Sequence, residues 1–406
     1  MTESAPESGP SARWLTRNVS AFGWSSFFSD LGHELVTALI PSFLVSLGAP
    51  PIGLGLIEGV SNFGLSAAEI WGGRQADKIR NRVPLLDAGY LATMLKALIA
   101  VVPAWPWILL IRTVAWVGRG ERGPVRNAMI ADEVAREHWG KAYGFREALD
   151  TAGAVIGPLL VVLLIGHLQI RLLIGLSAIP AVISVIIVFV VVREIPHRLT
   201  QPPKLDLRPA DYSPTFQRFL AGATLFAVGY VAPTFFILRA TQLLHGHGGA
   251  AAISLAIALY TVHNFVYALM SYPAGALSDR ISPRILLLGG YAIWVAVLVG
   301  FAAGSSSLIV LALLFIGSGA ATAFISPVQT TWAAQLMSDE SRGRGLGLLS
   351  GLSGFGQLIS GILVGLVWTQ ATAAPAFIAS AVLALLGLLL TASISPTATP
   401  ANTPGA

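Results

Sequence analysis

Three ionisable side chains stand close together in an otherwise apolar stretch near the N-terminus: Asp30, His33 and Glu34. In a helix, spacings of three and four residues place side chains on one face. If this helix crosses a bilayer, the three groups lie near its midplane, where each charge disfavours insertion by about 2.5 to 3.5 kcal/mol. Such groups normally face a water-filled cavity or a partner. We therefore predict that they bind protons or substrate; a permanent internal salt bridge is the alternative.

Charged groups that can act with them lie in two later apolar runs, Glu58 in the second and Arg112 and Arg119 in the fourth. Arg119 lies at a depth similar to that of Asp30, so the two could pair. An arginine partner favours the ionised carboxylate, and separation of the pair favours its protonation. Breaking the pair during transport would then couple proton uptake to movement. The alternative is that Arg119, and Arg122 even more so, contacts lipid headgroups.

Two further ionisable residues in this region have other interpretations. Glu69 lies just before a run of cations, so we expect it to contact them in a structural role. Lys96 lies deeper in the third apolar run. Its ammonium group could extend to the membrane surface or pair with a carboxylate, and both interpretations stay open.

The composition places these residues in a membrane protein. Of 406 residues, 54% are apolar and only 11% are charged, whereas about 25% charged residues is usual in soluble domains. Cysteine is absent, which excludes disulfides and thiolate metal sites. The net charge is +5, but the cations lie in alternate loops as membrane topology requires. They form no single patch for nucleic acid, so we expect no nucleic-acid partner.

Apolar runs near the roughly 20 residues needed to cross a bilayer recur along the whole chain. They fall at about 19–47, 52–73, 84–103, 106–128, 143–166, 172–192, 217–239, 251–274, 285–303, 307–330, 345–368 and 373–393. The predicted fold class is an all-α polytopic membrane protein with twelve transmembrane helices in two six-helix bundles. The predicted domains are a disordered tail (1–18), an N-terminal bundle (19–192), a proline-rich linker (193–216), a C-terminal bundle (217–393) and a second disordered tail (394–406).

The distribution of cations predicts the orientation. Most Lys and Arg residues fall in the tails and in the loops on the same side, whereas Arg171 and Arg239 lie near the opposite face. Cytoplasmic loops carry the excess of Lys and Arg. We therefore predict a multi-pass protein of the inner cell membrane with both termini in the cytoplasm.

A charged segment after the second run, 73–82, has a counterpart about half a chain length later, 275–284. Both contain glycine, aspartate, a cation, isoleucine and arginine at the same spacing. One repeat of this length indicates two similar halves rather than a short-period solenoid. In an apolar chain it is typical of transporters whose halves rock about a central site.

These segments resemble the loop motif G-x-L-x-D-R-x-G-R-R of the major facilitator superfamily, and the likeness spans residues 19 to 393. The matching positions are Gly73, Asp77, Lys78 and Arg82 in the first copy and Gly275, Asp279, Arg280 and Arg284 in the second. The resemblance implies a conformational latch, in which each aspartate meets the start of a helix in the other half. Asp77 would lie near Gly345, and Asp279 near Ala142.

The fifth run carries a second resemblance. Gly153, Gly157 and Pro158 are similar to the antiporter motif G-x-x-x-G-P-x-x-G-G, although Val161 and Val162 replace its last two glycines. The glycines allow close helix packing and the proline favours a bend. The resemblance implies export, and the segments around it also resemble a bacterial subgroup of uncharacterised permeases.

The leading hypothesis is a secondary active transporter working by alternating access, which exports a small molecule in exchange for protons. Asp30, His33, Glu34, Glu58, Arg112 and Arg119 would carry protons or substrate. Because the second half has no deep charge, we expect it to supply apolar and aromatic substrate contacts: Phe226, Tyr230, Tyr260 and Trp332. One alternative is proton-coupled uptake of an organic anion held by Arg112 and Arg119. Another is a sensor that does not transport.

Other classes of function lack their signatures. His33-Glu34 is followed by Thr37 where a metalloprotease would need a second histidine. No Walker loop is present, so ATP is not expected to drive the protein. His245 and His247 resemble a metal pair but have no third ligand. We expect no enzymatic activity, metal or cofactor; the expected partners are the lipid bilayer, a small-molecule substrate and a coupling proton, and the chain should act as a monomer.

Overall fold

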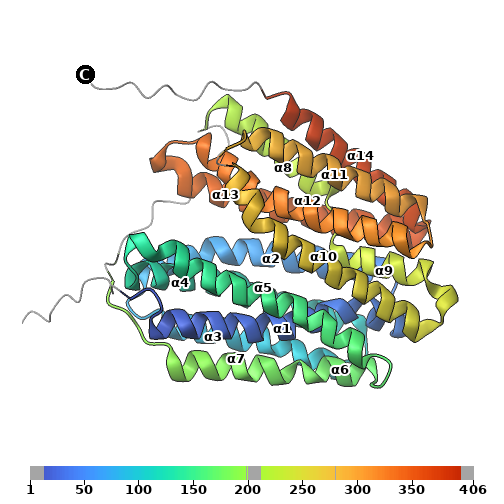
Figure 1. The fold of residues 1–406 in the computed structure, drawn as a ribbon, viewed down its shortest axis with the longest axis horizontal. Helices are drawn as coiled ribbons and strands as arrows, with labels where there is room; N and C mark the ends of the chain where they lie inside the picture. Colours follow the sequence, from blue (N-terminus) through green and yellow to red (C-terminus); the bar gives the residue numbers. More distant parts are fainter. Residues whose placement is uncertain (1–12, 198, 200–211, 279, 395–406) are drawn as a thin grey trace, which may run out of the picture.

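The computed structural model describes residues 13–197, 199, 212–278 and 280–394, and within these ranges the regular elements are all helical. The first half contains six long helical segments (Figure 1): α1 (Arg17–Ser46), α2 (Pro51–Lys78), α3 (Val83–Met94) extended by the 3-10 helix η1 (Leu95–Val101), α4 (Trp105–Glu133), α5 (Trp139–Leu164), and α6 (Ile170–Leu176) followed directly by α7 (Ala178–Val191). A short 3-10 helix, η2 (Arg136–His138), precedes α5.

The second half repeats this plan with six more segments. They are α8 (Pro214–Gly229) followed by α9 (Pro233–Leu243), α10 (Gly249–Ser278), α11 (Pro283–Ala303), α12 (Leu308–Gln335), α13 (Asp339–Gln370) and α14 (Ala373–Ala392). The run expected at 217–239 is thus interrupted between α8 and α9. Pro233 explains the break, because a proline disfavours helical geometry in the residue before it and is well accommodated in the first turn of a new helix.

The predicted all-α fold of twelve helices is confirmed. In the part of the chain that the structure describes, nine helical segments are long and apolar enough to cross a membrane. The segments α1, α2 and α4 are as long as the others but do not meet this criterion. Their lower hydropathy has a simple cause, since α1 carries Asp30 and Glu34, α2 carries Glu58, and α4 carries several arginines.

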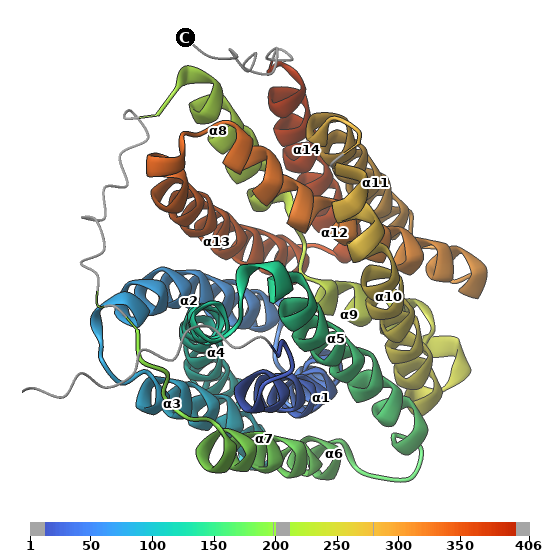
Figure 2. The same cartoon turned by 60° about the vertical axis from the view of Figure 1, so that its left-hand side comes forward.

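The helices form two groups that face each other. In Figures 1 and 2, α1–α7 lie on one side and α8–α14 on the other, with α2 beside α13 and α5 beside α10. We call the end of the molecule at which α1 begins and α2 ends the basic end, after Arg17, Lys78 and Arg82. The chain leaves α14 at this same end (Figure 1). The division at 193–216 and the two disordered tails stay predictions, because much of those segments lies outside the described residues.

At the end opposite the basic end, the two halves touch through glycines. Gly55 and Gly59 of α2 face Gly361 and Gly365 of α13, and a Cβ added at Gly55 would overlap the Gly361 carbonyl group. The amide of Ile52 donates a hydrogen bond of 2.9 Å to the Thr369 hydroxyl across the same contact. Small residues four apart on both helices let the backbones approach closely. This contact closes the molecule at the opposite end.

Glycines also set the packing of α5 on α1. A Cβ at Gly153 or Gly157 would fall against the backbone of α1 around Phe27 and Leu31. Pro158 lies inside α5, which continues as a helix to Leu164. The glycines therefore position the helix that carries Asp150 beside the helix that carries Asp30, while the bend at Pro158 stays a prediction.

Candidate functional site

A cavity of about 690 Å³ lies between the two halves. One wall is a single face of α2, from Glu58 through Asn62 and Ser66 to Glu69. The facing wall comes from α8, α12 and α13 and their neighbouring segments. Its first lining residue on α2, Glu58, is next to Gly59, which packs on the Leu358 backbone. From there it extends along α2 toward the basic end.

The polar lining of the cavity has one sign of charge. Among the described residues, Glu58 and Glu69 line it, and no Lys, Arg or His does. The remaining polar lining groups are amides and hydroxyls, which can accept or donate hydrogen bonds. Among the described residues, no hydrogen bond or ion pair is found between Glu69 and the cations of the following loop. Its carboxylate instead accepts a hydrogen bond of 3.1 Å from Ser350 of α13.

Glu58 is neutralised from behind the cavity wall. Arg112 Nη2 of α4 lies 2.8 Å from Glu58 Oε1 and 3.0 Å from Oε2, and both side chains are buried. The Arg112 guanidinium also lies over the Trp116 ring, 4.1 Å from its centroid. The Trp116 indole in turn donates to the Asn62 side chain at 3.0 Å. The Arg112–Glu58 contact is charge-assisted and therefore strong, and it holds Glu58 in a fixed orientation. The neutral hydrogen bond from Trp116 orients Asn62.

Asp30 and Arg119 form a second pair, joining α1 to α4. Both Asp30 oxygens accept hydrogen bonds from Arg119, one of them from Nη2 at 2.8 Å. Asp30 is buried, whereas Arg119 is partly accessible. Asp150 of α5 lies 4.0 Å from the same guanidinium. Asp150 was not identified from the sequence. It could have been, because it lies three residues before Gly153, on a helix that packs against α1.

His33 and Lys96 form an unusual contact between two basic groups. Lys96 Nζ lies 2.8 Å from His33 Nδ1, and both side chains are buried. A hydrogen bond between these nitrogens requires that one of them accept, so the pair cannot hold its full complement of protons. The other ring nitrogen of His33 lies 3.6 Å from Glu34 Oε1. Lys96, His33 and Glu34 are thus a line of neighbouring ionisable groups, joined by one hydrogen bond and one contact of 3.6 Å.

Glu34 connects this line to the other half of the molecule. The Tyr260 hydroxyl of α10 donates a hydrogen bond of 2.8 Å to Glu34 Oε2. A second contact between the halves is made by Asn264, whose side-chain amide donates to the Ala154 carbonyl at 3.1 Å. Of these two contacts, only the one at Glu34 involves a titratable carboxylate, so its strength depends on protonation.

Two more arginines of α4 are buried and contact hydroxyl groups. Arg122 donates to Ser29 at 2.6 Å and to Thr93 at 3.2 Å, and Arg126 donates to Ser26 at 2.5 Å. The interpretation of Arg122 as a headgroup contact is therefore wrong. Arg122 and Arg126 lie three and seven residues after Arg119, which places all three on one face of the helix. This spacing could have shown from the sequence that Arg122 and Arg126 face the same side as Arg119.

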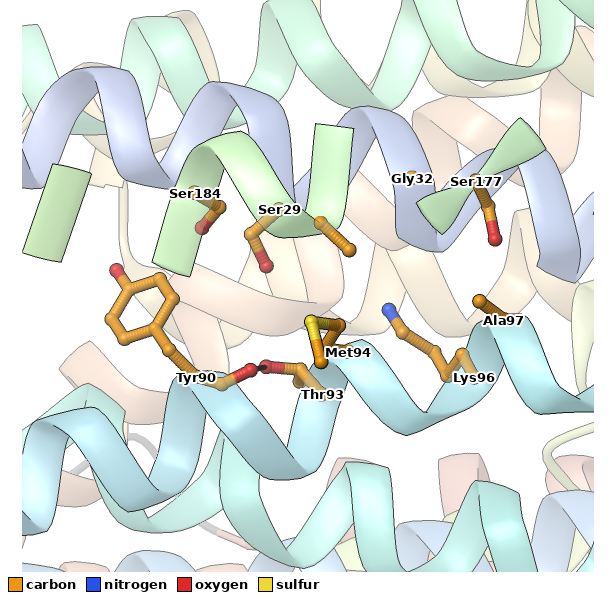
Figure 3. A pocket seen from close by; sticks show the side chains of 10 residues that line it. Ser29, Gly32, Tyr90, Thr93, Met94, Lys96, Ala97, Ser177 and Ser184 are labelled. Carbon is orange, nitrogen blue, oxygen red and sulfur yellow. Dashed lines mark hydrogen bonds between the residues drawn. The ribbon is translucent and has the colours of Figure 1, made fainter. Parts of the chain in front are cut away.

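A small cavity of about 10 Å³ lies beside this network, between α1, α3 with η1, and α7. Its polar lining includes Ser29, Thr93, Lys96, Ser177 and Ser184. Figure 3 shows the Lys96 nitrogen pointing into the space between its own helix and the helices that carry Ser29 and Ser177. A volume of this size corresponds to about one water molecule, so Lys96 borders a polar, water-sized space.

The four aromatic residues expected to contact substrate have different surroundings. Phe226 and Tyr230 line the large cavity. Their rings stack on buried aromatic residues behind them, Phe226 on Tyr291 with centroids 3.6 Å apart and Tyr230 on Trp294 at 4.3 Å. Tyr260 faces Glu34 instead. Trp332 is buried and does not line the cavity; it packs edge-on against Phe219 with centroids 5.1 Å apart.

In the first copy of the loop motif, Arg82 has a clear role. Its buried guanidinium pairs with Asp132 at 2.8 Å and with Glu194 at 3.3 Å, which fastens the loop to α4 and to the segment after α7. Asp77 and Lys78 are exposed, and no hydrogen bond or ion pair of Asp77 is found among the described residues. The contact expected between Asp77 and the start of α13 thus stays a prediction for another conformation.

The second copy is described only in part, because Asp279 lies outside the described residues. Arg284 donates a hydrogen bond of 2.6 Å to the Ala392 carbonyl at the end of α14. A Cβ added at Gly275 would meet open space. Arg280 is exposed. His245 and His247 belong to a short 3-10 helix before α10. Within the described ranges, no group of three or more potential metal ligands is found.

Comparison with known proteins places this arrangement in a broad context. The sequence model described as Major Facilitator Superfamily matches residues 22–260 and 215–406. An uncharacterised MFS-type transporter of Methanocaldococcus jannaschii is 29% identical over 384 residues, covering 93% of this chain and 95% of that protein. Multidrug resistance protein MdtG of Salmonella paratyphi C is 28% identical over 296 residues, covering 70% and 72%.

Solved structures share the fold at lower identity. The nucleoside transporter NupG superposes with a TM-score of 0.79 at 14% identity, covering 93% of this chain and 100% of that one. A bacterial homologue of the human lysosomal transporter Spinster, in an inward-facing and occupied conformation, gives a TM-score of 0.71 at 16% identity, covering 92% and 95%. At these identities, the likeness establishes the architecture alone.

Proposed function

Because the chain belongs to the Major Facilitator Superfamily, we propose that it is a secondary active transporter that exports a small molecule in exchange for protons. The observation that carries this proposal is the hydrogen bond between Glu34 and Tyr260, which joins the buried charges of one half to the other half. The resemblance of part of the chain to a multidrug resistance protein supports export.

The coupling step follows from the chemistry of this hydrogen bond. An ionised carboxylate accepts a stronger hydrogen bond than a protonated one does. Protonation of Glu34 therefore weakens the contact with Tyr260, and loss of the proton restores it. A ligand or proton that binds the two conformations unequally shifts the equilibrium between them. Glu34 is thus a group at which proton binding changes a contact between the halves, as Glu69 is where it accepts a hydrogen bond from Ser350. Asp30 and Arg119 form a pair that can separate.

The orientation proposed from the sequence agrees with an export function. If the basic end faces the cytoplasm, the large cavity extends toward the cytoplasm and is closed at the outer side by the glycine contact. This is the conformation in which an exporter takes up its substrate and an importer releases it, so the proposed direction rests on the likeness to a multidrug resistance protein. The inner cell membrane is the proposed location, and a monomer is the proposed working unit.

Uptake of an organic anion has less support. Under this hypothesis, Arg112 and Arg119 would hold the anion. In the structure, Arg112 is bound to Glu58 and Arg119 to Asp30. Neither arginine lines the large cavity. Freeing either of them would leave a carboxylate without its partner, which is costly in a buried site.

Flux measurements in proteoliposomes test the proposal. A panel of fluorescent probes with positive, negative and zero charge is offered under a pH gradient with the membrane potential clamped. Exchange for protons makes a probe accumulate when the interior is acidic, whereas symport requires an acidic exterior. We expect accumulation with an acidic interior, and its loss in Asp30→Asn and Glu34→Gln. Glu137→Gln, at an exposed position on η2, is the matched control.

Two results would contradict the proposal. Gradient-driven flux that is unchanged in both carboxylate variants would remove the proton-carrying role from Asp30 and Glu34. Absence of gradient-dependent accumulation for every probe in the wild-type protein would favour the sensor over the transporter.

A further inference from the structure

We infer that Glu69 is the binding site for the positive charge of an organic cation, which makes a monovalent cation with an apolar body the substrate class of the large cavity. The inference rests on the proposed function, because it concerns what the transporter carries. Glu69 lies on the same face of α2 as Glu58, eleven residues later, so the two carboxylates are about 16 Å apart along the helix.

The two glutamates differ in their charge partners. Glu58 has its charge matched by Arg112 at 2.8 Å. Glu69 accepts a hydrogen bond from Ser350, and no ion pair of Glu69 is found in the ranges that the structure describes. The charge of Arg119 on α4 acts on Glu69, but Arg119 is itself paired with Asp30 and does not line the cavity. A carboxylate that lines a cavity with no cation in the lining attracts positive charge there. Glu69 therefore gives the cavity a net negative charge.

The rest of the lining favours an organic cation over a metal ion. Leu346 and Leu349 lie with Ser350 on the α13 wall, and Phe226 and Tyr230 provide aromatic surface farther along. Apolar walls with a few placed polar groups are typical of small-molecule sites. A metal ion would need several converging ligands, whereas no group of three potential metal ligands exists among the described residues.

An organic anion does not fit the same site. No Lys, Arg or His from the described ranges lines the cavity, so an anion would be placed beside Glu69 without compensation. The sign of the substrate charge is thus set by one residue, and two probes of the same size and opposite charge can test it directly.

The experiment measures equilibrium binding of tetraphenylphosphonium and tetraphenylborate to the purified full-length protein in detergent. These ions have nearly the same shape and opposite charges. We expect the wild-type protein to bind the phosphonium ion and not the borate. Glu69→Gln should weaken phosphonium binding by about tenfold or more, because it removes the electrostatic attraction between the carboxylate and the phosphonium charge. Glu69→Asp keeps the charge and should retain part of the binding, and Glu137→Gln should bind like wild type.

Thermal unfolding of each variant confirms that it is folded, and Glu69→Asp keeps the test valid if Glu69→Gln is unstable. Equal phosphonium binding by wild type and Glu69→Gln would overturn the inference, as would wild-type binding of the borate in preference to the phosphonium ion, or of neither ion. No gradient is applied, so these results are independent of proton coupling. Failure of the export proposal would instead appear in the flux of the Asp30 and Glu34 variants.

Discussion

The two halves of this transporter share one helical plan but have opposite interiors. The first half buries ion pairs such as Asp30–Arg119 and Glu58–Arg112. The second half buries stacked aromatic rings, as in Phe236 on Phe301 with centroids 4.5 Å apart. At the spacing of the repeated loop motif, the arginines at 112 and 119 correspond to Leu314 and Ala321 of α12. Among the described residues, buried ion pairs are therefore a property of the first half and not of the fold.

This difference in buried groups suits the two halves to different tasks, one to responding to protons and the other to forming a wall of the substrate cavity. A buried charge is stable only when it is paired and hydrogen-bonded, so a network of such pairs responds strongly to a proton. Stacked rings gain from dispersion and burial, which do not depend on pH. The first half is thereby suited to coupling, and the second half to providing a stable, largely uncharged wall for substrate. The two tasks meet where Tyr260 contacts Glu34 and where the large cavity lies between α2 and the second half.

The largest expected effect comes from breaking an ion pair in the charged half. Arg112→Ala leaves the Glu58 carboxylate buried without its partner, and such losses cost about 3 to 5 kcal/mol. We expect a strongly lowered thermal unfolding temperature of the detergent-purified protein. The double variant Glu58→Gln/Arg112→Gln removes both charges and should recover much of the stability.

The matched control for Arg112→Ala is in the other half. Arg239 is partly exposed and donates one hydrogen bond of 3.4 Å to the Phe301 carbonyl, so Arg239→Ala should cost less than about 1 kcal/mol. If both arginine variants unfold at the same temperature, or if the double variant is no more stable than Arg112→Ala, the charge network does not distinguish the two halves.

A smaller effect is expected where the halves meet. Gly55→Ala places a Cβ against the Gly361 carbonyl, and overpacking of this kind costs about 1 to 3 kcal/mol. The conformation closed at this end should become less populated. Because the chain has no cysteine, a single cysteine at Gln357 in the cavity can report on this conformation, and its labelling by a maleimide from the basic end should slow by about tenfold. Gly144→Ala, whose Cβ would meet nothing, should label like wild type.

Labelling that is equally fast in Gly55→Ala and Gly144→Ala would show that the glycine contact does not control closure. The two halves would then be held together by side-chain contacts such as Tyr260 with Glu34, and the comparison between them would depend on charge alone.

Much of the fold could be predicted because hydropathy and repeats are local properties of the sequence. The twelve apolar runs, the repeat of 73–82 at 275–284 and the break near the middle all follow from residue type and spacing. The interruption between α8 and α9 was missed, although Pro233 was a visible signal. Helix-breaking prolines are tolerated in transmembrane runs, so a proline does not by itself fix where a helix ends.

The site was less predictable, because side-chain partners come from helices far apart in the sequence. The depth of Arg119 suggested a pair with Asp30, but nothing in the sequence indicated that Lys96 would contact His33 or that Tyr260 would reach Glu34. The partner of Glu69 was likewise not predictable: the loop cations follow it in the sequence, but its hydrogen bond comes from Ser350 in the other half. Such partners are set by the rotation of each helix about its axis. Hydropathy constrains this rotation weakly in α1, α2 and α4, where charged residues interrupt the apolar surface.

The smallest expected effect compares two buried serines. Ser318 of α12 bonds to His263 Nδ1 at 2.7 Å, a neutral contact between helices of the kind that contributes about 0.6 kcal/mol on average in membranes. Ser29 of α1 accepts from Arg122 at 2.6 Å, a contact with a charge that is worth roughly 1.5 to 3 kcal/mol. Ser318→Ala should therefore leave proton-driven flux unchanged and barely lower the unfolding temperature, whereas Ser29→Ala should lower both. If Ser318→Ala stops flux while the protein stays folded, the polar groups of the second half take part in coupling, because loss of a purely structural hydrogen bond would act through stability alone.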